Sequence, residues 1–127
     1  MGSQWSPLVV SEAPADADAI GNVVGLLERL VAGYGTRPVA RLLDVNASMI
    51  TRWRAGKPIS ATMARRIIDL HDLLNRALQI FSPSAAAQWL VGSEPFLGGA
   101  RPIDALAIHG IVPVIEALGA IEDNVYY

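Results

Sequence analysis

The stretch from Pro38 to Lys57 reads PVARLLDVNASMITRWRAGK, and its pattern predicts two short helices joined by a sharp turn. Apolar side chains stand where two crossing helices need buried contacts, at Val39, Leu43, Val45, Ile50 and Trp53. Ala40 supplies the small side chain that is needed where the two backbones come close. Asp44 stands at the turn, and aspartate tolerates the left-handed backbone that glycine more often provides there. The stretch therefore predicts a helix-turn-helix unit.

The second helix of this unit carries the side chains that we expect to bind DNA. If Ile50 and Trp53 face inward, the opposite face presents small and polar side chains that can enter the major groove. Ser48 and Thr51 can donate to phosphates or base edges, and the planar fork of Arg52 matches guanine O6 and N7. The other DNA-binding candidates flank this face: Arg41, Asn46, Arg54 and Lys57. The same packing also suits an αα-hairpin without a DNA role.

The distribution of charge along the chain bears on this choice. Residues 1–35 carry one base and four acids, residues 36–76 eight bases and three acids, and residues 77–127 one base and five acids. The net charge of −2 thus hides a basic middle between two acidic ends. A polyanionic partner for the middle would explain this pattern, although a solvated helix surface explains the charge equally well. The basic excess and the matched apolar positions together favour DNA binding.

The rest of the sequence predicts further helices and no strands, so we expect an all-α fold. Residues 1–17 have prolines and no apolar period, and they are expected to form a mobile arm. We expect a helix-turn-helix domain over residues 18–81 and a small helical module over residues 82–127. In the first half of the chain, the expected helices run from a cap at Asp18 to Gly33, from Pro38 to Leu43 and from Ala47 to Ala55. Pro38 is expected in the first position of its helix, with Thr36 or Arg37 as the cap. In the second half, the expected helices run from Ser60 to Phe81, from Pro83 to Val91, from Pro102 to Ile108 and from Val112 to Glu122, with a loop from Ser93 to Arg101.

Two segments resemble known families, in the same order along the chain. Residues 50–57, ITRWRAGK, resemble the recognition helix and its exit in Xre/Cro-type repressors. Residues 88–90 (QWL), Pro95, residues 97–99 (LGG) and residues 101–106 (RPIDAL) are similar to the toxin-binding domain of Xre/MbcA/ParS antitoxins, and residues 114–118 (VIEAL) with 121–122 are similar to its last helix. The resemblance implies an antitoxin that binds and neutralises a RES-domain toxin, which consumes NAD or transfers its ADP-ribose. It also implies binding to operator DNA, repression of the chain's own operon, and a homodimer within larger toxin–antitoxin complexes.

The toxin-binding candidates follow from this resemblance and from the end of the chain. Within the similar segments they are Trp89, Leu97, Gly98 and Gly99, although for Trp89 a core role that anchors the loop is the favoured interpretation. The final residues are acidic and doubly aromatic, and we hypothesise that this tail enters a basic nucleotide pocket of the toxin. The tail candidates are Glu122, Asp123, Asn124, Tyr126 and Tyr127. A frayed terminus is the alternative for the two tyrosines.

Composition argues against several other classes. There is no cysteine, no secretory signal and no apolar run of membrane-spanning length, so we expect a cytoplasmic bacterial protein without membrane contact. No catalytic or nucleotide-binding motif is present, and His71 and His109 lack a second ligand at metal spacing, so neither an enzyme nor a cofactor or metal is expected. Two alternatives stay open: a stand-alone dimeric helix-turn-helix repressor without a toxin partner, and a protein-interaction module that no longer binds DNA.

Overall fold

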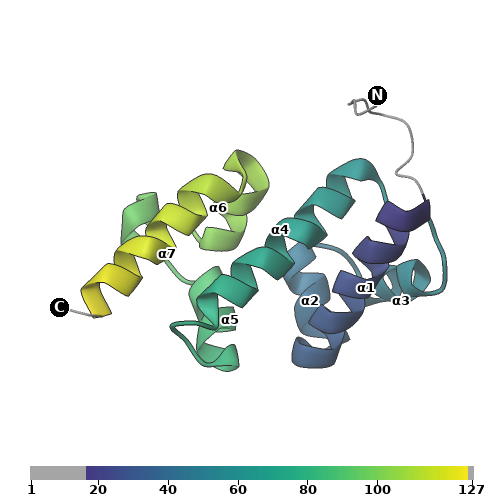
Figure 1. Ribbon diagram of the computed structural model, residues 1–127, viewed down its shortest axis with the longest axis horizontal. Coiled ribbons are helices and arrows are strands. Elements are labelled where there is room, and N and C mark those ends of the chain that lie inside the picture. The colour runs from purple at the N-terminus through teal and green to yellow at the C-terminus, as the bar shows by residue number, and fades with distance from the viewer. Residues whose placement is uncertain (1–16, 126–127) are drawn as a thin grey trace. The chain divides into compact units, whose positions relative to one another are not determined.

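The computed structural model describes residues 17–125, and side chains for residues 22–124. Within this range the chain forms seven α-helices and one short 3-10 helix, with no strand, which confirms the expected all-α fold (Figure 1). The expected arm over residues 1–16 lies outside the described residues. The chain divides into two compact units, residues 1–67 and 68–127, so that the division falls inside α4 (Ala61–Ala77). A functional boundary at residue 82 stays a prediction.

The N-terminal unit is built on α1 (Ala17–Tyr34), α2 (Thr36–Leu43) and α3 (Ala47–Arg54). Helix α1 packs against both α2 and α3, and these two helices pack against each other (Figure 1). Apolar side chains at three- and four-residue spacing on α1 face this junction because that spacing places them on one side of a helix. The buried apolar residues of this unit are Val23, Leu27, Leu30, Val39, Ala40, Leu42, Leu43, Ile50, Trp53 and Ile67.

The start of α2 differs from the expectation. The helix begins at Thr36 with Gly35 as its cap, so Pro38 is the third residue of the helix rather than the first. Gly35 has a φ of 92°, a backbone conformation that glycine adopts readily, and this lets the chain turn directly from α1 into α2. Pro38 is tolerated there because the first four backbone N–H groups of a helix have no partner within it. Helix α1 likewise begins at Ala17, so the expected cap at Asp18 is wrong.

Helix α4 is shorter than the sequence suggested. Its start is as expected, since the Ser60 hydroxyl accepts a hydrogen bond from the backbone N–H of Met63 at 3.1 Å. Its end comes at Ala77, and the backbone N–H groups of Gln79 and Ile80 bond three residues back, which tightens the chain into a turn. The expected apolar face up to Phe81 therefore ends early, and Leu78 is exposed.

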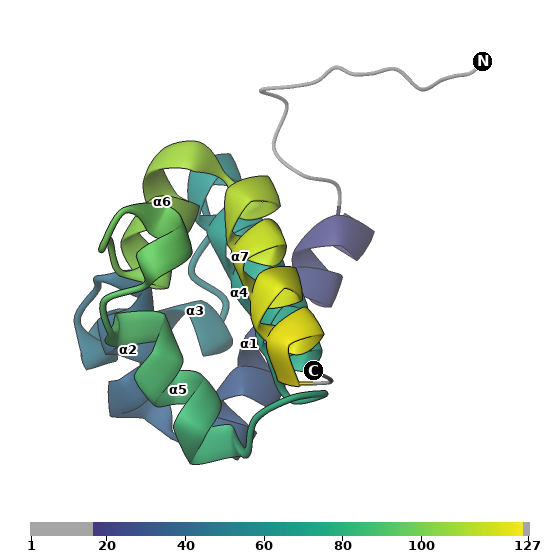
Figure 2. The same ribbon diagram turned by 90° about the vertical axis from the view of Figure 1, so that its left-hand side faces the viewer.

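The C-terminal unit contains the end of α4, followed by α5 (Pro83–Val91), the 3-10 helix η1 (Pro95–Leu97), α6 (Pro102–His109) and α7 (Ile111–Val125). The expected loop thus contains η1, and the last helix starts one residue earlier and ends three residues later than expected. Helix α6 packs against α5 and α7, and η1 packs against α7 (Figure 2). The buried residues of this unit with apolar side chains are Leu70, Leu73, Leu74, Ala77, Ala86, Leu90, Pro102, Ala105, Leu106, Val114, Ala117 and Leu118.

Candidate functional site

The turn between α2 and α3 has the geometry that the sequence predicted. Asp44 has φ 57° and ψ 48°, and it is the one non-glycine residue with a positive φ in the part of the chain that the structure describes. The backbone N–H of Val45 donates to the carbonyl of Ala40 at 2.9 Å, so the two helices cross closely at this small side chain. Ile50 is fully buried and Trp53 nearly so, which fixes the inward face of α3.

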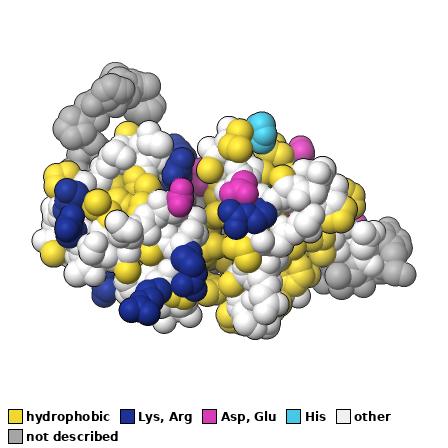
Figure 3. Space-filling model, turned by 180° about the vertical axis from the view of Figure 1, so that it is seen from behind, with side chains coloured by type: hydrophobic (Ala, Val, Ile, Leu, Met, Phe, Trp, Pro, Cys, Tyr) yellow, Lys and Arg dark blue, Asp and Glu magenta, His cyan; other side chains and the backbone are white. Residues whose placement is uncertain are grey.

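The outward face of α3 presents the side chains that were expected to bind DNA. Ser48, Thr51 and Arg52 are exposed, because they lie on the helix opposite Ile50 and Trp53. The Thr51 hydroxyl donates to the carbonyl of Ala47 at 3.4 Å, a long bond that an external acceptor can replace. Figure 3 shows dark-blue basic side chains distributed over the N-terminal unit. This face therefore presents exposed donors on a unit that carries several basic side chains.

The flanking candidates fall into two groups. Arg41, Asn46 and Lys57 are exposed, and none of them has a side-chain hydrogen bond or ion pair to another described residue. Arg54 is different: its Nε donates to Oε1 of Glu28 at 2.9 Å, and its Nη2 lies 2.9 Å from the same oxygen. Arg54 thus joins the end of α3 to α1, and a phosphate would have to replace Glu28 before Arg54 could bind it.

The loop before α6 is organised by Glu94, which the sequence analysis did not select. Among the residues that the structure describes, Glu94 is the one charged residue that is buried, with 4% of its surface exposed. Its Oε2 accepts a hydrogen bond from the indole Nε1 of Trp89 at 2.7 Å, and its Oε1 accepts one from the backbone N–H of Phe96 at 3.0 Å. A carboxylate is stable in such a place only when hydrogen bonds replace its water. A signal existed in the sequence, because an acidic residue directly before Pro95 is typical of a helix cap.

The backbone of Glu94 holds the rest of the loop. Its carbonyl accepts hydrogen bonds from the N–H groups of Leu97 and Gly99, at 3.0 and 2.9 Å, and its N–H donates to Ala100 at 3.1 Å. Gly98 and Gly99 have φ angles of 67° and 88°, which explains why glycine stands at both positions. Leu97 is half-buried and the two glycines are exposed. The structure therefore gathers the predicted residues from Trp89 to Gly99 around one buried carboxylate.

The predicted tail candidates lie on the last turn of α7 or beyond it. Glu122, Asp123 and Asn124 are exposed, and none has a side-chain hydrogen bond or ion pair within residues 22–124. Tyr126 and Tyr127 lie outside the described residues. The last turn contains no basic residue, so its two carboxylates face the negative end of the helix dipole, which is unfavourable.

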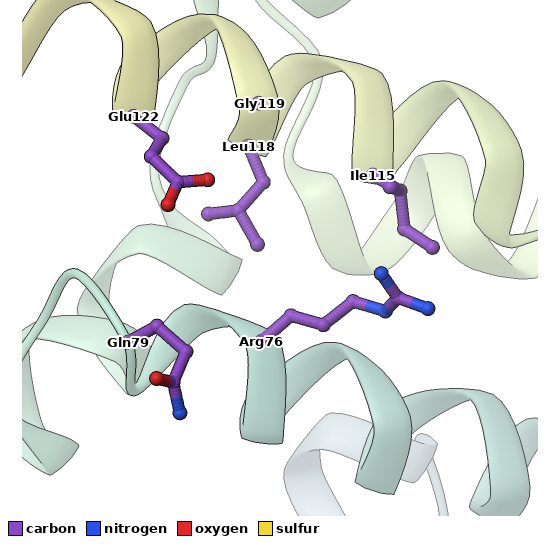
Figure 4. Close-up of a pocket in the computed structure, with 6 residues that line it drawn as sticks. All are labelled: Arg76, Gln79, Ile115, Leu118, Gly119 and Glu122. Carbon is purple, nitrogen blue, oxygen red and sulfur yellow. The ribbon is translucent and has the colours of Figure 1, made fainter.

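A cleft of about 220 Å³ runs beside this helix within the C-terminal unit. Ile115 and Leu118 point from α7 toward α4, and the Arg76 side chain extends beneath Ile115 (Figure 4). Gln79, Gly119 and Glu122 complete the lining. Arg76 also donates to Oδ1 of Asp72 at 3.1 Å, an ion pair within α4.

A second carboxylate in this unit is held by an arginine. The Nε and Nη2 atoms of Arg101 donate to the two carboxylate oxygens of Asp104, at 2.8 and 2.9 Å. These hydrogen bonds, together with the positive charge of Arg101, lower the pKa of Asp104 from its usual 3.8, although partial desolvation acts in the opposite direction. Within residues 17–125, no three histidine or acidic side chains lie close enough to share a metal ion, and no helix is long and apolar enough to cross a membrane.

A curated protein of Mycobacterium tuberculosis, Probable mycobacterial cidal antitoxin Rv3188, is 30% identical to this chain over 88 residues. The matched region is 69% of this chain and 76% of the relative. The chain belongs to the mycobacterial cidal antitoxin family. No protein-family model matches the sequence of this antitoxin, and no solved structure matches it.

The antitoxin carries its two sets of predicted residues on separate units. The DNA-binding candidates belong to the N-terminal unit, on and beside α3, and the toxin-binding candidates to the C-terminal unit, around Glu94 and at the end of α7. The roles predicted for the individual residues remain predictions.

Proposed function

We propose that this antitoxin binds and neutralises a RES-domain toxin, one that consumes NAD or transfers ADP-ribose, and that it represses its own operon through α3. The proposal rests on one observation: in this member of an antitoxin family, α3 has a buried apolar face and an exposed polar face. Ile50 and Trp53 are buried, whereas Ser48, Thr51 and Arg52 are exposed on the opposite face. An antitoxin needs a toxin partner, and a helix divided in this way is suited to the major groove.

The DNA half of the proposal assigns a role to three basic residues. Arg52 reads a guanine through two parallel hydrogen bonds, because its planar fork matches O6 and N7. Arg41 and Lys57 bind phosphates on either side, since both are exposed and have no ion-pair partner among the described residues. Asn46 and Ser48 add contacts at the N-terminal end of α3. A homodimer would place two such helices in half-sites about 34–36 Å apart.

The toxin half rests on the end of α7. Glu122 and Asp123 are exposed carboxylates that the described residues leave without a cation, at a helix end that disfavours them. A pocket that binds the pyrophosphate of NAD needs basic groups, and these groups would bind carboxylates equally well. Asn124, Tyr126 and Tyr127 extend this proposed contact into the toxin's nucleotide pocket, with the tyrosines as anchors.

The test is to purify the full chain with its bound partners from its native host, beside a version that lacks residues 122–127. We expect the full chain to hold a small protein and to block that protein's toxicity and its reaction with NAD. The shortened chain should lose the blocking and keep DNA binding, because α3 belongs to the other unit. Neutralisation by the shortened chain would refute the role of the tail. If DNA alone accompanied the full chain, the stand-alone dimeric repressor would replace the antitoxin mechanism proposed here.

A further inference from the structure

Phe96 is an aromatic side chain that the fold exposes rather than buries. It is one of the two phenylalanines of the chain, and 58% of its surface is exposed. The other, Phe81, packs near the ring of Trp89, with 6.1 Å between the ring centroids. Phe96 therefore contributes little to the core of its unit, and its exposed apolar surface calls for another explanation.

The backbone that carries Phe96 is fixed by a buried carboxylate. Glu94 Oε1 accepts the Phe96 N–H at 3.0 Å, while Oε2 accepts the Trp89 indole at 2.7 Å. The Ser93 hydroxyl donates to the carbonyl of Gly99 at 2.9 Å and closes the base of the loop. A side chain on such a preorganised turn loses little backbone freedom when it binds a partner. The loop thus fixes the backbone that carries Phe96 in the free protein.

The loop segment that carries Phe96 is uncharged in sequence. From Pro95 to Ala100 the loop contains no ionisable side chain, and the carboxylate of Glu94 points inward. Gly98, Gly99 and Ala100 are exposed and small, so the phenyl ring projects above its neighbours. A projecting apolar ring fits a concave apolar pocket, which is the usual arrangement at the centre of a protein interface.

We infer that Phe96 is an aromatic anchor that inserts into an apolar pocket on the toxin. This inference rests on the proposed function and deepens it, because η1 packs against α7, the helix that carries Glu122 and Asp123. One partner surface can then meet both the apolar ring and the acidic helix end. The partner is accordingly expected to combine an apolar pocket with a basic region.

A second copy of the chain is a poorer occupant for this position. A two-fold symmetric contact places the same patch against itself, so one projecting ring would meet another with small residues around both. Stable protein interfaces bury about 800 Å² on each partner, and a lone ring surrounded by glycines supplies only a small part of that area. The toxin, which is free to have a matching pocket, is the occupant that we propose.

The experiment uses the toxin that the full chain holds and blocks, purified as the probe and titrated with variants of the full-length antitoxin. Phe96→Ala should raise the Kd at least about thirtyfold, which corresponds to about 2 kcal/mol. The matched control is Ile108→Ala, since Ile108 is even more exposed (73%) and lies at the end of α6 outside the Glu94 loop. The control should change the Kd less than about threefold. Neither variant should lower the melting temperature of the free antitoxin.

A photo-crosslinking amino acid, p-benzoylphenylalanine, placed at position 96 of the full chain provides the second measurement. A crosslink to the toxin is expected, and a crosslink to a second copy of the antitoxin would overturn the inference. A Phe96→Ala variant that binds the toxin as tightly as the wild type would overturn it as well, while leaving the proposed function intact. A wild-type chain that fails to bind or block any toxin would instead refute the proposed function, and the inference with it.

Discussion

Arg54 at the end of α3 binds one carboxylate oxygen of Glu28 on α1 through two of its nitrogen atoms, each at 2.9 Å. Both side chains are partly exposed, at 38% and 49%, so the pair contributes at most about 1 kcal/mol to folding. Its larger effect concerns the charge available beside α3. Glu28 neutralises a cation at a position where the proposed DNA binding would need a phosphate contact.

Glu28→Gln should therefore strengthen DNA binding. Arg54 would then be available to a phosphate, and the slope of log K against log salt should become steeper by up to about 0.9. The measurement is binding to duplex DNA over a series of salt concentrations. Asp72→Asn is the matched control, because it removes the Arg76 ion pair on the other unit and should leave DNA binding unchanged. An unchanged slope for Glu28→Gln would mean that Arg54 never reaches the backbone of DNA.

Arg52→Ala should weaken binding to the operator by about 1–3 kcal/mol and relax specificity at one base pair, if Arg52 binds a guanine edge. Arg41→Ala should weaken binding to all sequences by a similar factor, because a phosphate contact carries no sequence information. Affinities for a panel of single-base operator variants would separate the two. An equal loss for Arg52→Ala on every sequence would place Arg52 on phosphate as well.

Glu94→Ala should lower the free energy of unfolding by about 1–3 kcal/mol, since the indole N–H of Trp89 and the N–H of Phe96 would lose their acceptor. Urea unfolding followed by tryptophan fluorescence reports both the stability and the environment of the indole. Glu116→Ala removes an exposed carboxylate from the same unit and should stay within about 0.5 kcal/mol of the wild type. Equal behaviour of the two variants would contradict the organising role of Glu94.

Tyr34→Phe should leave stability at neutral pH unchanged or raise it by up to about 1 kcal/mol. The Tyr34 hydroxyl is buried and has no hydrogen-bond partner among the described residues, so its removal relieves an unsatisfied group. Burial also raises the pKa of Tyr34 above 10.0. The stability linked to this proton is fully present below the pKa that Tyr34 has in the unfolded chain. It is lost as pH rises through the higher pKa that Tyr34 has in the folded chain. Urea unfolding at neutral and alkaline pH should show that loss in the wild type and not in the phenylalanine variant.

Arg101→Gln should raise the pKa of Asp104 toward its usual 3.8, because hydrogen bonds from Arg101 are the main cause of its depression. The stability that comes from this pair is present above the pKa of an unfolded aspartate and is lost as pH falls through the lower folded value. An NMR titration of the Asp104 carboxyl carbon in both proteins measures the shift directly. Identical titration curves would assign the depression to another group.

Local features of this fold were predictable, and features that join distant residues were not. The left-handed Asp44 and the inward pair Ile50 and Trp53 were both predicted, and each depends on neighbours within a few residues. The early start of α2 was missed because Pro38 was taken as its first residue, whereas the positive φ of Gly35 lets the helix begin at Thr36. The pairing of Arg54 with Glu28 spans 26 residues and depends on how α1 packs, which residue spacing alone does not determine.

The candidate site shows the same division. Exposure of Ser48, Thr51 and Arg52 followed from helical periodicity, and Gly98 and Gly99, which have positive φ angles, lie within the expected loop. Glu94 was missed, since an acidic residue in a loop is normally solvated and its burial depends on the position of the Trp89 ring.

The acidic last turn of α7 also has a consequence for the lifetime of the protein. Like charges at the negative end of the helix make this turn open more readily than one with a basic end. An open turn is a substrate for proteases, whereas a partner that supplies cations would keep it closed. Cleavage at this turn would then be fast for unbound copies and slow for bound ones, so that the amount of antitoxin in the cell would follow the amount of its partner.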